Sequence, residues 1–328
     1  MTTIADVAAE AGVSKATVSR VFSHPEVVRP ETRERVLATA RDLSFRPNRI
    51  ARSLASGRTG SVGLVVPDVA NPYFGPVIKA VQRDARREDL TVLTADSDEL
   101  DADEFSIAGT LAQQADGLIL FSPRMSEDAI RELVSRRPLV VINRDIDGVP
   151  GVVISADEGM EQAVEHLVAL GHRRIAYVSG PAGSFSNVAR TRAVRAAARK
   201  FDVALVEFGP FEPFFASGMR AGDLVIASGA TAAIAYNDLL ALGVIQLLTQ
   251  RGLTVGADMS IVGFDDIWLA PMIQPPLTTV HAPAPEAGST ALRWLIEMMR
   301  TPQDDLVHRQ IRMSCELVVR SSTGPAPR

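Results

Sequence analysis

The chain has 328 residues, of which 46% are hydrophobic and 22% charged, so we expect a globular protein with two or three compact units. The single cysteine, Cys315, excludes an internal disulfide and fits a reducing compartment. The start MTTIADVAAEAGV lacks the basic and apolar regions of a signal peptide, and no apolar run is long enough to span a membrane. We therefore expect a cytoplasmic protein without a membrane partner.

The charge is distributed unevenly along the chain. The chain has 34 basic and 39 acidic residues. Residues 1–58 contain ten basic and six acidic residues, so residues 59–328 contain 24 basic and 33 acidic ones. A basic head on an acidic body indicates a polyanionic partner for the head alone.

Residues 3–23, TIADVAAEAGVSKATVSRVFS, predict two short helices joined by a tight turn. Thr3 can cap the first helix, Gly12 suits the turn, and Ser14 can cap the second helix. Small polar and cationic side chains form the outer face near the start of the second helix, at Lys15, Ala16, Thr17, Ser19 and Arg20. This layout is typical of a helix-turn-helix whose second helix enters the DNA major groove. The alternative interpretation is a generic helical hairpin.

Two further helical segments follow in the head. PETRERVLATARDLSF begins with Pro30 at a first helical position, and its apolar side (Val36, Leu37, Ala40 and Leu43) would close a three-helix core. PNRIARSLASGRTG, residues 47–60, has the apolar stripe of a short helix with arginines around it. A helix of fewer than about 12–15 residues is marginal in water, so this segment needs a partner to fold against.

Beyond residue 60, apolar strands alternate with helices. Strands are predicted in SVGLVVPD, DLTVLTAD, DGLILFS and PLVVINR, and the pattern restarts after Gly159 with RRIAYVSGP, ATAAIAYND and DMSIVGFDD. Strands that are apolar throughout and alternate with helices indicate parallel sheets covered on both faces. We therefore expect two similar α/β lobes.

Independent motifs then identify a family. The head motif continues through ETRERVLATARDLSFRPNRIARSLASGRTGSVGLVVPD, and NPYF, EHLVALGHRRIAYVSGP, YNDLLALGV and IVGFDDIWLAPMIQPPLTTV follow in order. Together these motifs cover essentially the whole chain, which resembles the LacI/GalR family of bacterial transcription regulators. The resemblance implies an N-terminal all-α helix-turn-helix domain with a hinge helix. An α/β periplasmic-binding-protein-like domain of two doubly wound parallel-sheet lobes would follow.

The resemblance also implies boundaries. The helix-turn-helix domain is expected at residues 1–46, the hinge helix and linker at 47–59, and the effector-binding and dimerisation domain at 60–328. Lobe 1 would comprise about 60–158 and 283–310, and lobe 2 about 159–282 and 311–322. The crossovers between lobes would lie near residues 157–161, 281–284 and 309–313.

In this family two hinge helices lie side by side in the minor groove, and a leucine, here Leu54, is wedged into a base step. The alternative is that this segment is an ordinary linker. The resemblance implies a homodimer on pseudo-palindromic, double-stranded operator DNA. The candidate DNA-binding residues are Thr3, Ser14, Lys15, Ala16, Thr17, Ser19 and Arg20 in the head, and Asn48, Arg49, Arg52 and Leu54 in the hinge.

Polar residues that follow predicted strands are the candidates for a ligand site, because ligands of parallel sheets bind beyond the carboxyl ends of strands. These residues are Asn143, Arg144, Asn237 and Asp265. By position in the family's motifs, Asn237, Asp265 and Arg192 match residues that contact effector, and Phe74 matches a position at the cleft. Such groups suit sugar hydroxyls, so a sugar is the expected small-molecule effector. Each polar residue could instead cap a helix or brace a loop.

One stretch departs from the family's pattern. After ARTRA the chain is shortened and reads GPFEPFFASG, with Phe211, Phe214 and Phe215 close together. The sequence does not indicate which of the three faces the cleft. The cluster could line an apolar-faced pocket or equally pack between the lobes.

Enzymatic motifs are absent from the sequence. No G-x-G-x-x-G follows the first strand, and the chain has no P-loop, H-E-x-x-H or G-x-S-x-G. The five histidines have no metal-like spacing, so no enzyme, metal site or cofactor is expected. The sequence predicts a ligand-responsive, sequence-specific repressor of carbohydrate uptake or catabolism genes. The alternative, a solute-binding protein of the periplasmic type without a transcriptional role, does not explain residues 1–58.

Overall fold

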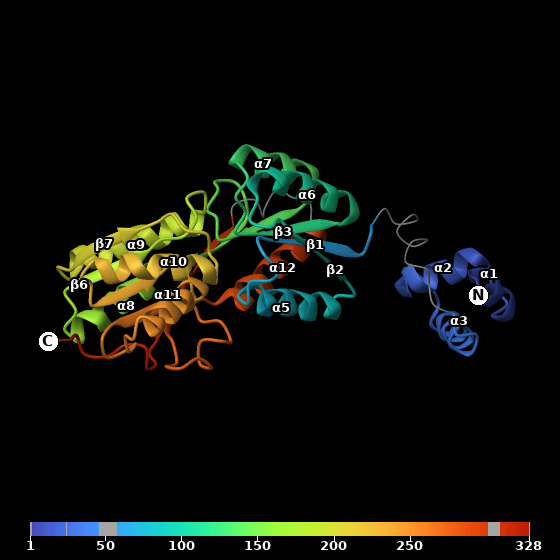
Figure 1. The fold of residues 1–328 in the computed structure, drawn as a ribbon. Helices are drawn as coiled ribbons and strands as arrows, with labels where there is room; N and C mark the ends of the chain where they lie inside the picture. Colours follow the sequence, from blue (N-terminus) through green and yellow to red (C-terminus); the bar gives the residue numbers. More distant parts are fainter. Residues whose placement is uncertain (1, 24, 46–57, 301–308, 328) are drawn as a thin grey trace. The chain divides into compact units, whose positions relative to one another are not determined.

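The computed structural model describes residues 2–23, 25–45, 58–300 and 309–327. The chain divides into two compact units, Met1–Gly60 and Ser61–Arg328 (Figure 1). Within the described ranges, no helix is both long enough and apolar enough to cross a membrane. The hinge candidates Asn48, Arg49, Arg52 and Leu54 lie outside the described residues.

The described part of the first unit, which we call the head, contains the helices α1 (Ile4–Glu10), α2 (Lys15–Ser23) and α3 (Pro30–Asp42), with a 3₁₀ turn at Pro25–Val27. Thr3 and Asp6 form a capping box that satisfies the N-terminus of α1. Gly12 has φ +64°, a conformation that glycine adopts without steric cost, and this turn separates α1 from α2. The three helices bury one small core of Val7, Ala8, Ala11, Val18, Val21, Val36 and Ala40.

Lobe 1 is a parallel sheet with helices on both faces, in the strand order β11-β5-β4-β3-β1-β2. The strands are β1 (Ser61–Val66), β2 (Thr91–Asp96), β3 (Gly117–Phe121), β4 (Leu139–Ile142), β5 (Gly151–Ser155) and β11 (Gln310–Ser314). The helices are α5 (Phe74–Arg87), α6 (Asp101–Gln114), α7 (Glu127–Arg136) and α12 (Ala284–Arg300). Helices α5 and α12 lie on one face of this sheet and α6 and α7 on the other (Figure 1). Side chains alternate along β1, so Leu64 packs in the core with α5 and α12, whereas Val65 packs with α6 and α7.

Lobe 2 repeats this architecture with the strand order β12-β10-β9-β8-β6-β7. The strands are β6 (Arg174–Val178), β7 (Ala204–Phe208), β8 (Ala232–Ala235), β9 (Ser260–Asp265), β10 (Thr278–His281) and β12 (Glu316–Val318). The helices are α8 (Asp157–Ala169), α9 (Phe185–Lys200), α10 (Phe215–Ala227) and α11 (Asp238–Gln250). All pairings are parallel except that of β12 with β10, so the edge of this sheet is antiparallel.

The chain crosses between the lobes three times: after β5, between β10 and α12, and at Cys315 between β11 and β12. The third crossover was expected at residues 309–313, with 311–322 in lobe 2, and this expectation is wrong. Gln310–Ser314 pairs residue by residue with β5, so residues 311–314 belong to lobe 1. The segment QIRMSCELV contains no Gly, Pro, Asn or Asp and is mostly exposed, so neither a strong turn signal nor a hydrophobic alternation marks the crossing in the sequence.

Candidate functional site

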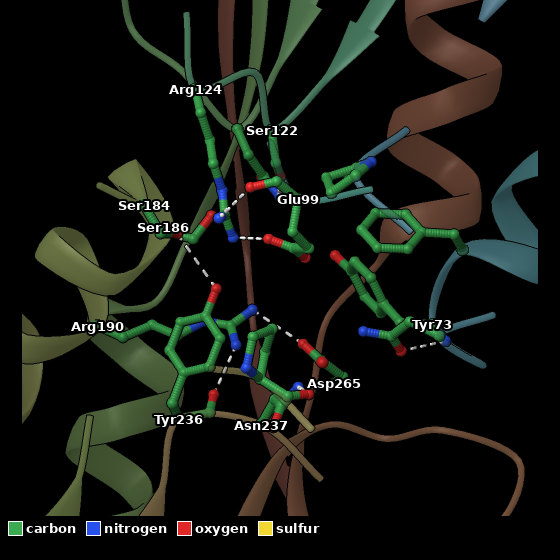
Figure 2. A pocket seen from close by; sticks show the side chains of 15 residues that line it. Tyr73, Glu99, Ser122, Arg124, Ser184, Ser186, Arg190, Tyr236, Asn237 and Asp265 are labelled. Atoms are coloured by element: carbon green, nitrogen blue, oxygen red, sulfur yellow. Dashed lines mark hydrogen bonds and ion pairs between the residues drawn. The ribbon is translucent and has the colours of Figure 1, made fainter. Parts of the chain in front are cut away.

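A cleft lies between the two lobes of the second unit, beyond the carboxyl ends of both sheets (Figure 2). Lobe 1 lines it with Pro67, Asn71, Tyr73, Phe74, Glu99, Ser122, Arg124 and Asn143. Lobe 2 lines it with Ser184, Ser186, Arg190, Pro213, Tyr236, Asn237 and Asp265. Four predicted residues, Phe74, Asn143, Asn237 and Asp265, are therefore brought together here.

A buried ion pair forms the floor of the cleft in lobe 2. Arg190 Nη2 lies 2.8 Å from Asp265 Oδ1, and its Nη1 donates to the Tyr236 carbonyl at 2.6 Å. The guanidinium carbon lies 3.7 Å from the Phe264 ring centre and 4.6 Å from that of Tyr236. Two aromatic faces and a carboxylate thus hold the guanidinium in one orientation.

Burial and the ion pair act in opposite directions on these two groups. Burial raises the pKa of Asp265 to about 6, while Arg190 opposes the rise, so the carboxylate stays ionised at neutral pH. Burial disfavours the charge on Arg190, but the Asp265 carboxylate and the nearby tyrosine hydroxyls together outweigh it, and the pKa of the guanidinium is raised. The site therefore presents an acceptor and a donor side by side in a setting with little water.

The prediction that Arg192 lines the cleft is wrong. Its side chain is 66% exposed on the surface of α9 and lies 3.5 Å from Asp157, which is 53% exposed. The residue that reaches the cleft is Arg190, in the same ARTRA motif. Two residues apart on a helix point to opposite sides, and Arg190 shares its side with the buried Ala193, Val194 and Ala197.

Asn237 and Asn143 both line the cleft and hold local structure. Asn237 Oδ1 accepts from the Leu240 amide at 2.9 Å, which caps α11, and its Nδ2 donates to the Pro213 carbonyl at 3.1 Å. Asn143 has φ +62°, and its side chain bonds Ser122 Oγ at 3.1 Å and the Ile154 amide at 3.2 Å. The functional and structural interpretations of these asparagines are therefore both supported.

Arg144 does not line the cleft, which corrects its assignment to the site. Its Nη1 donates to the Pro123 carbonyl at 3.1 Å and also to the Met125 carbonyl. It braces the loop after β3 from behind. The chain leaves β4 through Asn143 in a left-handed conformation, and of the two neighbours only Asn143 lines the cleft.

Aromatic side chains form the apolar wall of the cleft in lobe 1. Phe74 is buried and packs edge-to-face on Tyr73 and Phe121, with ring centres 5.0 and 5.4 Å away. The Tyr73 hydroxyl points into the cleft near Asn143, and no described side chain gives it a well-formed hydrogen bond (Figure 2). Such a buried hydroxyl is available to a bound molecule. Tyr73 stands in the NPYF motif beside Phe74 but was not predicted as a site residue.

A second ion pair, between Glu99 and Arg124, lies in lobe 1 and was also missed. Arg124 Nη1 donates to the Glu99 carbonyl at 3.0 Å, and Nη2 contacts Glu99 Oε2 (Figure 2). Burial lowers the pKa of the Arg124 guanidinium. Both residues follow strands, β2 and β3, so the rule that selected Asn143 could have found them.

None of Phe211, Phe214 and Phe215 lines the cleft, and Pro213 takes the position between them. Phe211 is half-buried against the core of lobe 2, while Phe214 and Phe215 are exposed at the start of α10. The aromatic wall of the cleft comes from lobe 1 and Tyr236 instead.

In the head, the candidate DNA-binding side chains lie on the outer face of α2. Lys15, Ala16, Ser19 and Arg20 are exposed and Thr17 is half-buried, whereas Val18 and Val21 are buried. Thr3 and Ser14 are exposed caps, and Ser14 Oγ accepts from the Thr17 amide at 3.1 Å. The exposed face therefore contains polar and cationic groups at a helix N-terminus, the arrangement that reads base edges and phosphates.

Comparison with known proteins agrees with both units. Residues 3–48 match "Bacterial regulatory proteins, lacI family", and residues 164–323 match "Periplasmic binding protein-like domain". Catabolite control protein A of Priestia megaterium is 34% identical, over 90% of this chain and 92% of its own. The transcriptional repressor PurR of Aliivibrio fischeri is 31% identical over 99% of both chains.

Solved structures give the same result. The lac repressor dimer bound to operator and the anti-inducer ONPF superposes with a TM-score of 0.86 at 28% identity, covering 98% of this chain and 99% of that one. The complex of the regulator CelR with cellobiose has a TM-score of 0.72 at 27% identity, covering 98% and 100%. The resemblance seen in the sequence is confirmed, and the chain belongs to the LacI family of bacterial transcription regulators.

Proposed function

We propose that this transcription regulator is a homodimeric, cytoplasmic repressor of carbohydrate uptake or catabolism genes. Residues 1–59 bind a pseudo-palindromic operator, and a sugar bound between the lobes changes the affinity for that operator. The protein works by binding alone and catalyses no reaction.

The observation that carries this proposal is a cleft built by both lobes from directional polar groups beside aromatic faces. Asp265, Asn237 and Tyr73 offer acceptors and donors for hydroxyls, while Phe74 and Tyr73 offer apolar surface. A ligand that touches both lobes stabilises one angle between them. Binding can alter operator affinity only through such a difference between two arrangements. Sugar-bound structures of similar regulators, with cellobiose or ribose, support a sugar as the ligand.

The operator half of the proposal rests on the head. Lys15 and Arg20 are exposed on α2, and the net charge of residues 1–58 is positive, whereas that of the remaining chain is negative. Cations near the recognition helix can contact phosphates and base edges together. A solute-binding protein would need no such head, so that alternative is not favoured.

Dimer formation is supported by large apolar side chains that lobe 2 exposes. Phe214, Phe215 and Leu224 on α10, with Trp268 and Met272 after β9, are exposed in the single chain. Exposed apolar groups of this size are commonly covered at a protein interface. A two-fold symmetric dimer would place two heads on two half-sites, which explains the expected pseudo-palindrome.

The experiment has two steps. Selection of bound duplexes from a random DNA library defines the operator, and thermal-shift screening with glucose, ribose, cellobiose, adenine and hypoxanthine tests for compounds that stabilise the fold. Operator affinity is then measured with each stabilising compound at one salt concentration. We expect a pseudo-palindromic site and at least a tenfold affinity change with a sugar. Selection of an asymmetric site, or stabilisation by a purine alone, would contradict the proposal.

A further inference from the structure

All four charged side chains that line the cleft are already paired within their own lobe. Glu99 and Arg124 form one pair in lobe 1, and Arg190 and Asp265 form the other in lobe 2. The lining therefore carries two positive and two negative charges. Among these lining residues, each guanidinium that a ligand could contact already has a carboxylate beside it.

The pair in lobe 1 is held in place by its surroundings. The side chains of Arg124 and Glu99 are only 14% and 10% exposed. Buried Glu104 accepts from the backbone amides of Arg124 and Met125 at 2.8 and 2.7 Å, which fixes the loop that carries Arg124. The backbone under Arg124 is therefore fixed, and its side chain would lose both the ion pair and the Nη1 bond to the Glu99 carbonyl if it turned away.

Glu99 is held just as firmly on its side. Its backbone has φ +59°, next to Asp98 at φ +51°, a conformation that side chains other than glycine rarely adopt. The Glu99 amide donates to the Pro67 carbonyl at 2.7 Å, and Asp96 Oδ1 accepts from the Asp98 amide at 2.8 Å. The loop adopts this strained backbone conformation, which places the Glu99 carboxylate against Arg124.

A phosphate or carboxylate on a ligand would have to take Arg124 away from Glu99 and leave a buried carboxylate unpaired, which is strongly unfavourable. An uncharged hydroxyl can donate to Glu99 or accept from Arg124 without separating them. We propose that the Glu99–Arg124 pair is a charge filter that admits uncharged, hydroxyl-rich effectors and rejects their phosphorylated forms. This inference rests on the proposed function and specifies the class of ligand.

The test uses inorganic phosphate as the anion, because removal of Glu99 should leave Arg124 free to bind it. Phosphate binding to the full-length protein is measured by isothermal titration calorimetry in a phosphate-free buffer. Glu99→Gln should gain at least tenfold in phosphate affinity over the wild type. The double variant Glu99→Gln with Arg124→Gln should lose this gain, and Glu165→Gln, which removes an exposed charge on α8 outside the lining, should show none.

Should Glu99→Gln not fold, Glu99→Asn makes the same prediction, because asparagine tolerates the positive φ at this position. A folded Glu99 variant that bound phosphate no more tightly than the wild type would overturn the inference. A second measurement compares glucose with glucose 6-phosphate and ribose with ribose 5-phosphate on the wild type. If a phosphorylated sugar bound the wild type and released operator, the charge filter would be refuted while the proposed function would stand.

Discussion

The head and the cleft use their functional residues in opposite ways. In the head, Lys15 and Arg20 are exposed on α2, and the core lies behind them on Val18 and Val21. In the cleft, Arg190 and Asp265 are buried in an ion pair, so these proposed ligand contacts are also part of the fold. Substitutions should therefore separate binding from stability in the head but not in the cleft.

The largest effect is expected for Arg190→Met. This change removes one partner of a buried pair and leaves the buried Asp265 carboxyl without its cation, which costs about 3–5 kcal/mol of unfolding free energy. Urea unfolding followed by tryptophan fluorescence measures the loss. A double variant, Arg190→Met with Asp265→Leu, should be less destabilised than the single one. An unchanged unfolding midpoint for Arg190→Met would mean that the Arg190–Asp265 pair does not stabilise the fold.

A smaller effect, on binding alone, is expected for Lys15→Ala and Arg20→Ala. Each lost base contact weakens specific operator binding by about 1–3 kcal/mol, while the thermal unfolding midpoint should stay at the wild-type value. Fluorescence anisotropy at fixed salt provides the affinity. Arg35→Ala removes an exposed charge from α3 instead of α2 and serves as the matched control. An equal loss in the control would assign the effect to net charge.

The pH dependence of effector binding sharpens the same contrast. The pKa of Asp265 is raised from 3.8 to about 6, so the folded protein takes up this proton as the pH falls through 6. The uptake favours the folded state below pH 6 but removes an acceptor for a ligand hydroxyl. Effector affinity should fall about tenfold from pH 7 to pH 5, as measured by calorimetry. A flat profile would exclude the ionised Asp265 as an effector contact.

The smallest effect is expected for Arg192→Ala. The Arg192–Asp157 pair is mostly exposed, so its loss should change stability by no more than about 0.5 kcal/mol. Effector affinity should not change, because the side chain does not line the cleft. Thermal unfolding and calorimetry on the same preparation test both points. A loss of effector binding would restore Arg192 to the site.

The local structure of the head follows from short-range signals. The Thr3 cap, the Gly12 turn and the apolar spacing that includes Val18 are all encoded within a few residues, so the three helices were predicted closely. Asn237 and Asp265 were marked by both family motifs and strand ends, whereas Phe74 was marked by a motif alone and Asn143 by a strand end alone. All four line the cleft.

The remaining parts of the site depend on contacts that a linear pattern does not contain. Glu99 and Arg124 lie on separate loops and become a pair only when β1 brings the ends of β2 and β3 together. The strand Gln310–Ser314 is recognised only through its pairing with β5. Arg190 is a different case, because its spacing from Val194 and Ala197 was visible in the sequence and would have selected it over Arg192.

The central claim is that a ligand held by Asp265 controls the affinity of the head for DNA. Operator affinity of wild type and Asp265→Asn, each with and without the stabilising sugar at one salt concentration, tests it most directly. Asparagine keeps the size of the side chain and can still accept from Arg190. We predict wild-type operator affinity without sugar and no response to sugar in the variant. A full response to sugar in Asp265→Asn would contradict the claim.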